Sequence, residues 1–135
     1  MYTEEVKKHF SDPKNVGEIE NPDAVGEASN SSHGDIIKLY LKIEDNVITD
    51  IKFKAFGCAA AVATSSMFTV LAKNKNIEEA LNISKQDIAD ELGGLPENKM
   101  NCSNLAPDAF KIAVANYKKK KWIINNKGWN LWKKF

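Results

Sequence analysis

The chain has 135 residues, of which 43% are hydrophobic and 27% charged, and its net charge is +1. This length suits one domain, which can bury roughly two thirds of the surface of its unfolded chain. Because no run of about 18 apolar residues is present, we expect no transmembrane segment. The first ten residues are charged and lack the apolar core of a signal peptide, which indicates a cytoplasmic protein.

The first 30 residues predict a short helix followed by a loop. Thr3 is a candidate N-cap for a helix that ends near Phe10, and Glu4 and Glu5 are favourable at its positive end. Residues 11–27 are rich in Pro, Gly, Asn and Asp, which predicts a loop with at most one short strand at its end. We interpret His9 in the helix as a packing residue.

Two alternating segments predict a β-hairpin. The first has its apolar residues at every second position, namely Ile37, Leu39, Leu41 and Ile43. The second, residues 47–55, alternates in the same way after an Asp-Asn turn signal. A period of two places alternate side chains on opposite faces, so we expect an antiparallel pair with one buried face.

The second half of the chain predicts helices. Residues 59–74 have high helix propensity and are apolar on more than one side, which indicates a buried helix. Two short helices follow at 77–81 and 84–92, where Ser84 and Asp87 resemble a capping box. Residues 93–104 predict a loop, and residues 105–117 predict an amphipathic helix with Pro107 in its first turn. We therefore expect an α+β domain, an antiparallel three-stranded sheet covered by helices on one face.

Four residues with metal-binding side chains stand at the ends of these segments. His33 and Asp35 precede the first strand of the hairpin. Cys58 follows the second strand, and Cys102 precedes the last helix, so we expect helix dipoles to lower the pKa of the thiols. An imidazole, a carboxylate and two thiolates suit Zn²⁺, Fe²⁺ or a small iron–sulfur cluster. The simpler interpretations are a turn at His-Gly-Asp and small buried cysteines.

Three stretches, in this order, resemble the IscU/NifU-type iron–sulfur cluster assembly scaffold family. They read HFSDPKNVGEIENPDAVGE, GDIIKLYLKIEDNVITDIKFKAFGCAAAVATSS and LGGLPENKMNCSNLAPDAF. The resemblance runs from about residue 2 to 119 and implies the SufE/NifU fold. We therefore divide the chain into a scaffold domain, residues 1–120, and a basic aromatic extension, residues 121–135.

The resemblance implies a scaffold protein and not an enzyme. Such scaffolds build a transient 2Fe-2S cluster from iron and from persulfide sulfur that a cysteine desulfurase delivers, and pass it to apo-protein clients, with or without a chaperone. By position, Asp35, Cys58 and Cys102 match the family's aspartate and its second and third cysteines. Lys99 matches a lysine near the site that is not a ligand. Cys102 is then the implied persulfide acceptor.

Two positions depart from the family pattern. His33 replaces the first cysteine, and Asn101 replaces the histidine before the third. A neutral imidazole still binds metal, so we expect His33, Asp35, Cys58 and Cys102 to hold one Zn²⁺ or Fe²⁺, less tightly below about pH 6. If His33 is instead a solvated loop residue, the site is defunct and the fold serves partner binding. The alternative function is a zinc- or iron-binding regulatory relative that docks on a cysteine desulfurase without completing a cluster. An unrelated thiol enzyme ranks below both, because no base lies near Cys102 in the sequence.

The last 18 residues are basic and aromatic. They hold seven lysines, no acid and all three tryptophans of the chain. The Asn-Asn-Lys-Gly stretch predicts a small hairpin after residue 121 in preference to a helix. Such a segment can contact nucleic acid, an acidic membrane or an acidic partner, or its aromatic residues can pack on the domain. We expect no nucleic-acid partner, and a monomer or weak dimer.

Overall fold

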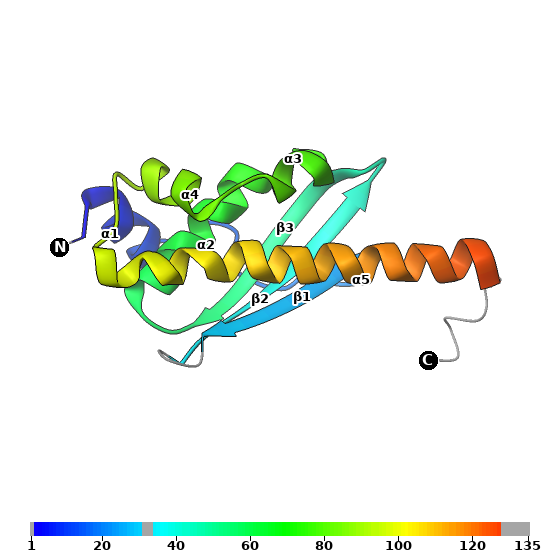
Figure 1. Cartoon of the computed structure of the whole chain (residues 1–135), viewed down its shortest axis with the longest axis horizontal. Coiled ribbons are helices and arrows are strands. Elements are labelled where there is room, and N and C mark those ends of the chain that lie inside the picture. Colours follow the sequence, from blue (N-terminus) through cyan, green and yellow to red (C-terminus); the bar gives the residue numbers. More distant parts are fainter. Residues whose placement is uncertain (1, 31–33, 128–135) are drawn as a thin grey trace.

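The computed structural model describes residues 2–30 and 34–127, with the side chains of residues up to 123. Figure 1 shows its elements, which in chain order are α1 (Glu4–Ser11), β1 (Ala24–Asn30), β2 (Asp35–Glu44), β3 (Val47–Phe56), α2 (Ala59–Ala72), α3 (Ile77–Leu81), α4 (Lys85–Glu91), the 3₁₀ helix η1 (Glu97–Asn104) and α5 (Leu105–Lys127). This order of strands and helices confirms the predicted α+β class.

The three strands form one antiparallel sheet in the order β1-β2-β3. Asp45 and Asn46 connect β2 to β3 with φ angles of 50° and 66°. Left-handed conformations at both turn residues match the twist of a two-residue hairpin, which explains the Asp-Asn signal. At the other end of the sheet Asn30 pairs with Asp35. Asp35 therefore lies where the regular sheet ends.

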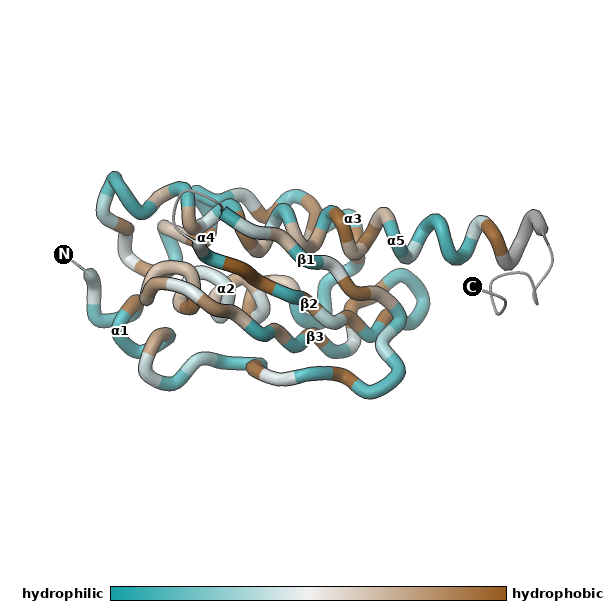
Figure 2. Tube along the Cα trace, turned by 90° about the horizontal axis from the view of Figure 1, so that it is seen from below, coloured by the Kyte–Doolittle hydropathy of each residue, from teal (hydrophilic) through white to brown (hydrophobic). Residues whose placement is uncertain are grey.

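One face of the sheet is covered by helices, as predicted. Ile37, Leu39 and Leu41 are fully buried on this face, where α2 and α5 pack. Figure 1 shows α5 running across the strands, and Figure 2, from below, shows α5 along the upper side of the three strands. A Cβ at Gly26 of β1 would lie 2.1 Å from the carbonyl oxygen of Ala109, so this glycine permits the close approach of α5.

The predicted caps define the short helices. The Thr3 hydroxyl accepts a hydrogen bond from the backbone N–H of Val6 and begins α1. Ser84 and Asp87 form the reciprocal capping box that begins α4. These local contacts satisfy backbone donors that have no partner inside a helix, which is why the sequence signals located the starts of both helices.

Two segments differ from the predictions. Residues 97–104 form the 3₁₀ helix η1, where we predicted a loop. The last helix does not end near Tyr117 but continues to Lys127, so the hairpin predicted after Lys121 is wrong for residues 121–127. Elongating an existing helix adds one hydrogen bond per residue, which outweighs the weak helix propensity of two asparagines. Residues 128–135 lie outside the described part of the chain.

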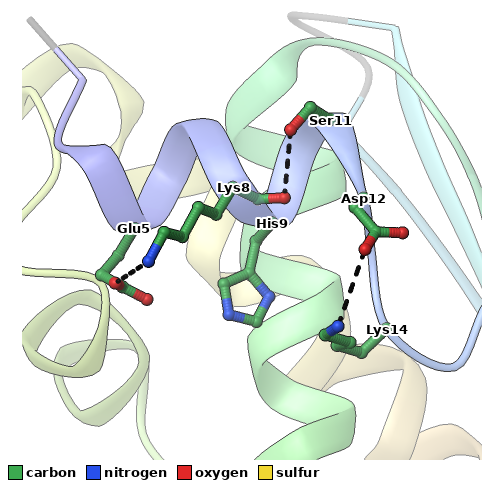
Figure 3. A pocket seen from close by; sticks show the side chains of 6 residues that line it. All are labelled: Glu5, Lys8, His9, Ser11, Asp12 and Lys14. Atoms are coloured by element: carbon green, nitrogen blue, oxygen red, sulfur yellow. Dashed lines mark hydrogen bonds and ion pairs between the residues drawn. The ribbon is translucent and has the colours of Figure 1, made fainter.

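His9 ties α1 to α2, which agrees with a packing role. Its Nδ1 lies 2.7 Å from Oγ of Ser66, and the same oxygen accepts a hydrogen bond from the backbone N–H of Lys14. Because burial favours the neutral imidazole, we assign the hydroxyl hydrogen of Ser66 to an unprotonated Nδ1 of His9. Burial lowers the pKa of His9, while Glu5 partly offsets that shift. Figure 3 shows His9 among the side chains that line a pocket at the end of α1.

We predict that His9 makes the fold less stable in acid. In the unfolded chain the imidazole titrates near its ordinary value, and in the folded chain its pKa is lower. Neutral His9 therefore contributes stability above about pH 6.5, and this is lost as pH falls through the folded pKa. Urea unfolding at about pH 7.5 and about pH 5 should show a larger loss for the wild type than for His9→Gln. Equal losses of unfolding free energy in the two proteins would contradict a lowered pKa of His9.

Candidate metal centre

Three elements bring Asp35, Cys58 and Cys102 together. Asp35 begins β2, Cys58 is the N-cap of α2 just after β3, and Cys102 lies near the end of η1. Their ligand atoms all lie within 4.8 Å of one another. The structure thus joins three of the four side chains that we expected to bind metal. The fourth, His33, lies outside the described residues.

The spacing of the three donor atoms fits one tetrahedral ion. The two sulfur atoms are 3.6 Å apart, and Oδ2 of Asp35 lies 3.8 Å from Sγ of Cys58 and 3.6 Å from Sγ of Cys102. With Zn–S and Zn–O bonds of about 2.3 and about 2.0 Å, a tetrahedral ion separates two sulfurs by about 3.8 Å and sulfur from oxygen by about 3.5 Å. A disulfide requires sulfurs about 2.05 Å apart, and both thiols are free.

The Asp35 carboxylate is fixed by the start of α2. Its Oδ1 accepts a hydrogen bond from the backbone N–H of Cys58 at 3.0 Å, which leaves Oδ2 beside the two sulfurs. The side chain is 1% exposed, so the positive end of α2 helps to stabilise a carboxylate that water does not reach. Asp35 is therefore held in position by the backbone and not by a flexible neighbour.

Gly57 makes room for this carboxylate. Its φ of +155° is a conformation that side chains disfavour, and a Cβ there would lie 2.1 Å from Oδ1 of Asp35. The sequence indicated that a glycine beside Cys58 permits close approach of the backbone, but not which group approaches. The contact could not be read from the sequence, because Asp35 begins β2 while Gly57 follows the end of β3, and the two meet only in the folded chain.

Cys102 packs against α2, and its side chain is fully buried. The Thr64 hydroxyl lies 2.7 Å from the carbonyl oxygen of Ala60, its nearest acceptor, and 3.3 Å from that of Cys102. Sequence analysis did not identify Thr64, because a threonine inside an apolar helix has no local signal for such a contact. Lys99 also lies in η1, where its backbone N–H donates to the carbonyl oxygen of Pro96.

The Cys102 thiol is protonated at neutral pH. Burial, together with the neighbouring Cys58 and Asp35, raises the pKa of Cys102 to about 12. The expectation that a helix dipole lowers the pKa of this thiol is therefore wrong. Two like charges about 4 Å apart repel by about 4 kcal/mol at an effective dielectric constant of about 20. A bound cation would remove this penalty and allow both sulfurs and the carboxylate to be anionic together.

Comparison with known proteins identifies the family. Residues 1–123 match the model of the NifU-like N terminal domain. Iron–sulfur cluster assembly scaffold protein IscU 1 of Archaeoglobus fulgidus is 54% identical over 93% of this chain and 82% of its own length. IscU of Aquifex aeolicus is 43% identical over 86% of this chain and 75% of its own length.

A solved structure agrees with this assignment. The crystal structure of a proposed iron–sulfur cluster assembly scaffold of the SUF system from Fervidobacterium islandicum AW-1 has a TM-score of 0.70 and 27% identity, and the match covers 84% of this chain and 96% of that one. The fold and the site thus define a domain with a thiol and carboxylate cluster between the start of the central strand β2 and the start of α2. The chain belongs to the family of NifU-like N-terminal domains.

We predict that Gly57→Ala weakens metal binding by displacing Asp35. Gly17→Ala is the matched control, because Gly17 has a φ of +137° but open space where its Cβ would lie. Both variants should lose stability from backbone strain, by about 1–3 kcal/mol. Only Gly57→Ala should also lose zinc affinity, by about tenfold to a hundredfold, as loss of a supporting contact typically does. A competition titration with a zinc-binding dye measures this, and equal affinities in the two variants would contradict it.

Proposed function

We propose that the chain is an iron–sulfur cluster assembly scaffold. Asp35, Cys58 and Cys102 bind iron, with His33 as a fourth ligand, and the site builds a transient 2Fe-2S cluster that passes to apo-proteins. The observation that carries the proposal is the set of three donors spaced for one tetrahedral ion, in a chain whose relatives are named as scaffolds. The proposal for His33 rests on the sequence, in which one residue separates it from Asp35.

Sulfur reaches this site through Cys102 in the proposed mechanism. Its thiolate attacks the outer sulfur of a persulfide on a cysteine desulfurase, so that a new S–S bond forms on Cys102 and the donor cysteine leaves as a thiolate. Cys102 is buried and its pKa is about 12, so η1 must move before this sulfur can react. The Lys99 ammonium, on the same 3₁₀ helix, would favour the thiolate once η1 has moved. Reduction of the delivered sulfur to sulfide requires a separate electron donor.

The two departures from the family pattern favour a second candidate function. With His33 and Asn101 in place of a cysteine and a histidine, the site has one thiolate fewer than the pattern that it resembles. Imidazole in place of thiolate leaves iron less electron-rich and raises its reduction potential. On this reading the chain binds zinc or iron and docks on a cysteine desulfurase without completing a cluster.

Anaerobic reconstitution with iron, cysteine and a cysteine desulfurase separates the two candidates. We expect the wild type to develop visible sulfur-to-iron charge-transfer absorbance, and Cys58→Ser to develop little or none because one of the two thiolates is missing. Ser65→Ala on the same helix is a control, since Ser65 is buried and its hydroxyl donates only to the carbonyl oxygen of Ala61. A colourless wild type that still binds the desulfurase would support the second candidate.

We predict that His33→Gln changes the pH dependence of zinc affinity. Because the pKa of Cys102 is about 12, protons compete with zinc for that sulfur throughout the neutral range in both proteins. A ligating imidazole adds a second competing proton below roughly pH 6.5. Between about pH 8 and about pH 5 the wild type should therefore lose more affinity than His33→Gln. The other histidine provides the control His9→Gln, and parallel profiles of wild type and His33→Gln would exclude imidazole ligation.

A further inference from the structure

The last turns of α5 form a basic surface away from the candidate metal centre. Figure 1 shows α5 extending past the end of the sheet. Lys118, Lys121 and Trp122 occupy positions i, i+3 and i+4, so they share one face of this helix. All three are exposed, Trp122 by 54%, and Lys119 beside them is exposed as well. Lys118 is paired with Glu78 of α3, and the ammonium of Lys121 lies over the ring of Tyr117.

The composition of this segment is unlike that of the rest of the chain. From residue 118 onward there are seven lysines and no acids, whereas residues 1–117 hold twelve lysines and eighteen acids, a net charge of about −6. All three tryptophans occur here, together with two isoleucines, a leucine and a phenylalanine. Tryptophan concentrates at the boundary between lipid and water, and lysine clusters bind anionic headgroups.

We infer that the exposed lysines and Trp122 near the end of α5 bind the surface of a bilayer rich in anionic lipid. The lysines supply attraction to the headgroups, and Trp122 supplies burial at the headgroup boundary. No helix in the described part of the chain is long and apolar enough to cross a membrane.

The composition of this segment is less well suited to binding nucleic acid than to binding a bilayer. All nineteen basic residues of the chain are lysine, and none is the arginine that makes paired hydrogen bonds to bases and phosphates. A solvated nucleic-acid-binding arm also has no need of seven large apolar residues among seven lysines. A lipid surface uses both kinds of side chain.

Binding at this end of α5 leaves the metal centre accessible. Cys102 lies just before the start of α5, and Trp122 lies near the far end. At about 1.5 Å per residue, the start of α5 and Trp122 are roughly 26 Å apart along the helix axis. A membrane-bound chain would thus present the cysteines away from the lipid.

Tryptophan fluorescence tests the inference directly, because every tryptophan of the full chain lies in this segment. Titration with phosphatidylcholine vesicles that contain phosphatidylglycerol should shift the emission to the blue, and flotation should recover the protein with the vesicles. Vesicles of phosphatidylcholine alone should bind much more weakly, and added salt should weaken binding to the anionic vesicles. Equal binding to neutral and anionic vesicles, or no binding to either, would overturn the inference.

Matched charge variants locate the surface. Lys119→Gln/Lys121→Gln should weaken binding to anionic vesicles by roughly thirtyfold, from about fivefold per lysine near the surface. Lys85→Gln/Lys111→Gln removes the same charge from exposed positions elsewhere and should change binding by less than about twofold. Equal effects of the two double variants would refute the assignment, as would tight binding of a single-stranded oligonucleotide without binding of vesicles. Circular dichroism verifies that both variants fold.

Discussion

The candidate site depends on one hydrogen bond, from the backbone N–H of Cys58 to Oδ1 of Asp35. It joins the first residue of β2 to the start of α2, and it leaves the second carboxylate oxygen facing both sulfurs. The bond is possible because Gly57 has no side chain where the carboxylate lies. The start of the central strand β2 and the start of α2 thus fix two of the three donors, while η1 carries the third.

This arrangement gives the site a strong dependence on bound cations. A buried carboxylate and two adjacent sulfurs cannot all be charged without a counter-charge, and the pKa of Cys102, about 12, reflects this. Metal binding must therefore release a proton from Cys102, and metal loss must take one up. That coupling opposes permanent retention of the metal, which suits the proposed function of a scaffold that passes its cluster on. The 3₁₀ helix that carries Cys102 has weaker hydrogen-bond geometry than an α-helix, so it is the element best suited to move.

Local signals in the sequence predicted the regular structure well. The alternation of residues 37–43 and 47–55, the caps at Thr3 and Ser84 and the Asp-Asn turn each depend on neighbours in the chain, and each is confirmed. The length of α5 was predicted wrongly, because weak helix formers near residue 125 were given more weight than elongation of an existing helix.

The donor residues were predicted from their places at segment ends and from the family resemblance. The distances between these donors could not be predicted, since Asp35, Gly57 and Cys102 meet only in the folded chain. The pKa of Cys102 was predicted in the wrong direction for the same reason: the sequence shows a cysteine before a helix, but not the burial and the neighbouring acid that outweigh the helix dipole.

X-ray absorption spectroscopy of the zinc-loaded wild-type chain tests the central claim most directly, because it counts the atoms bound to the ion. The geometry of Asp35, Cys58 and Cys102 predicts about two sulfur neighbours at about 2.3 Å per zinc, with the remaining neighbours oxygen or nitrogen at about 2.0 Å. A spectrum without sulfur neighbours, or with four of them, would show that this cluster does not bind the ion as described.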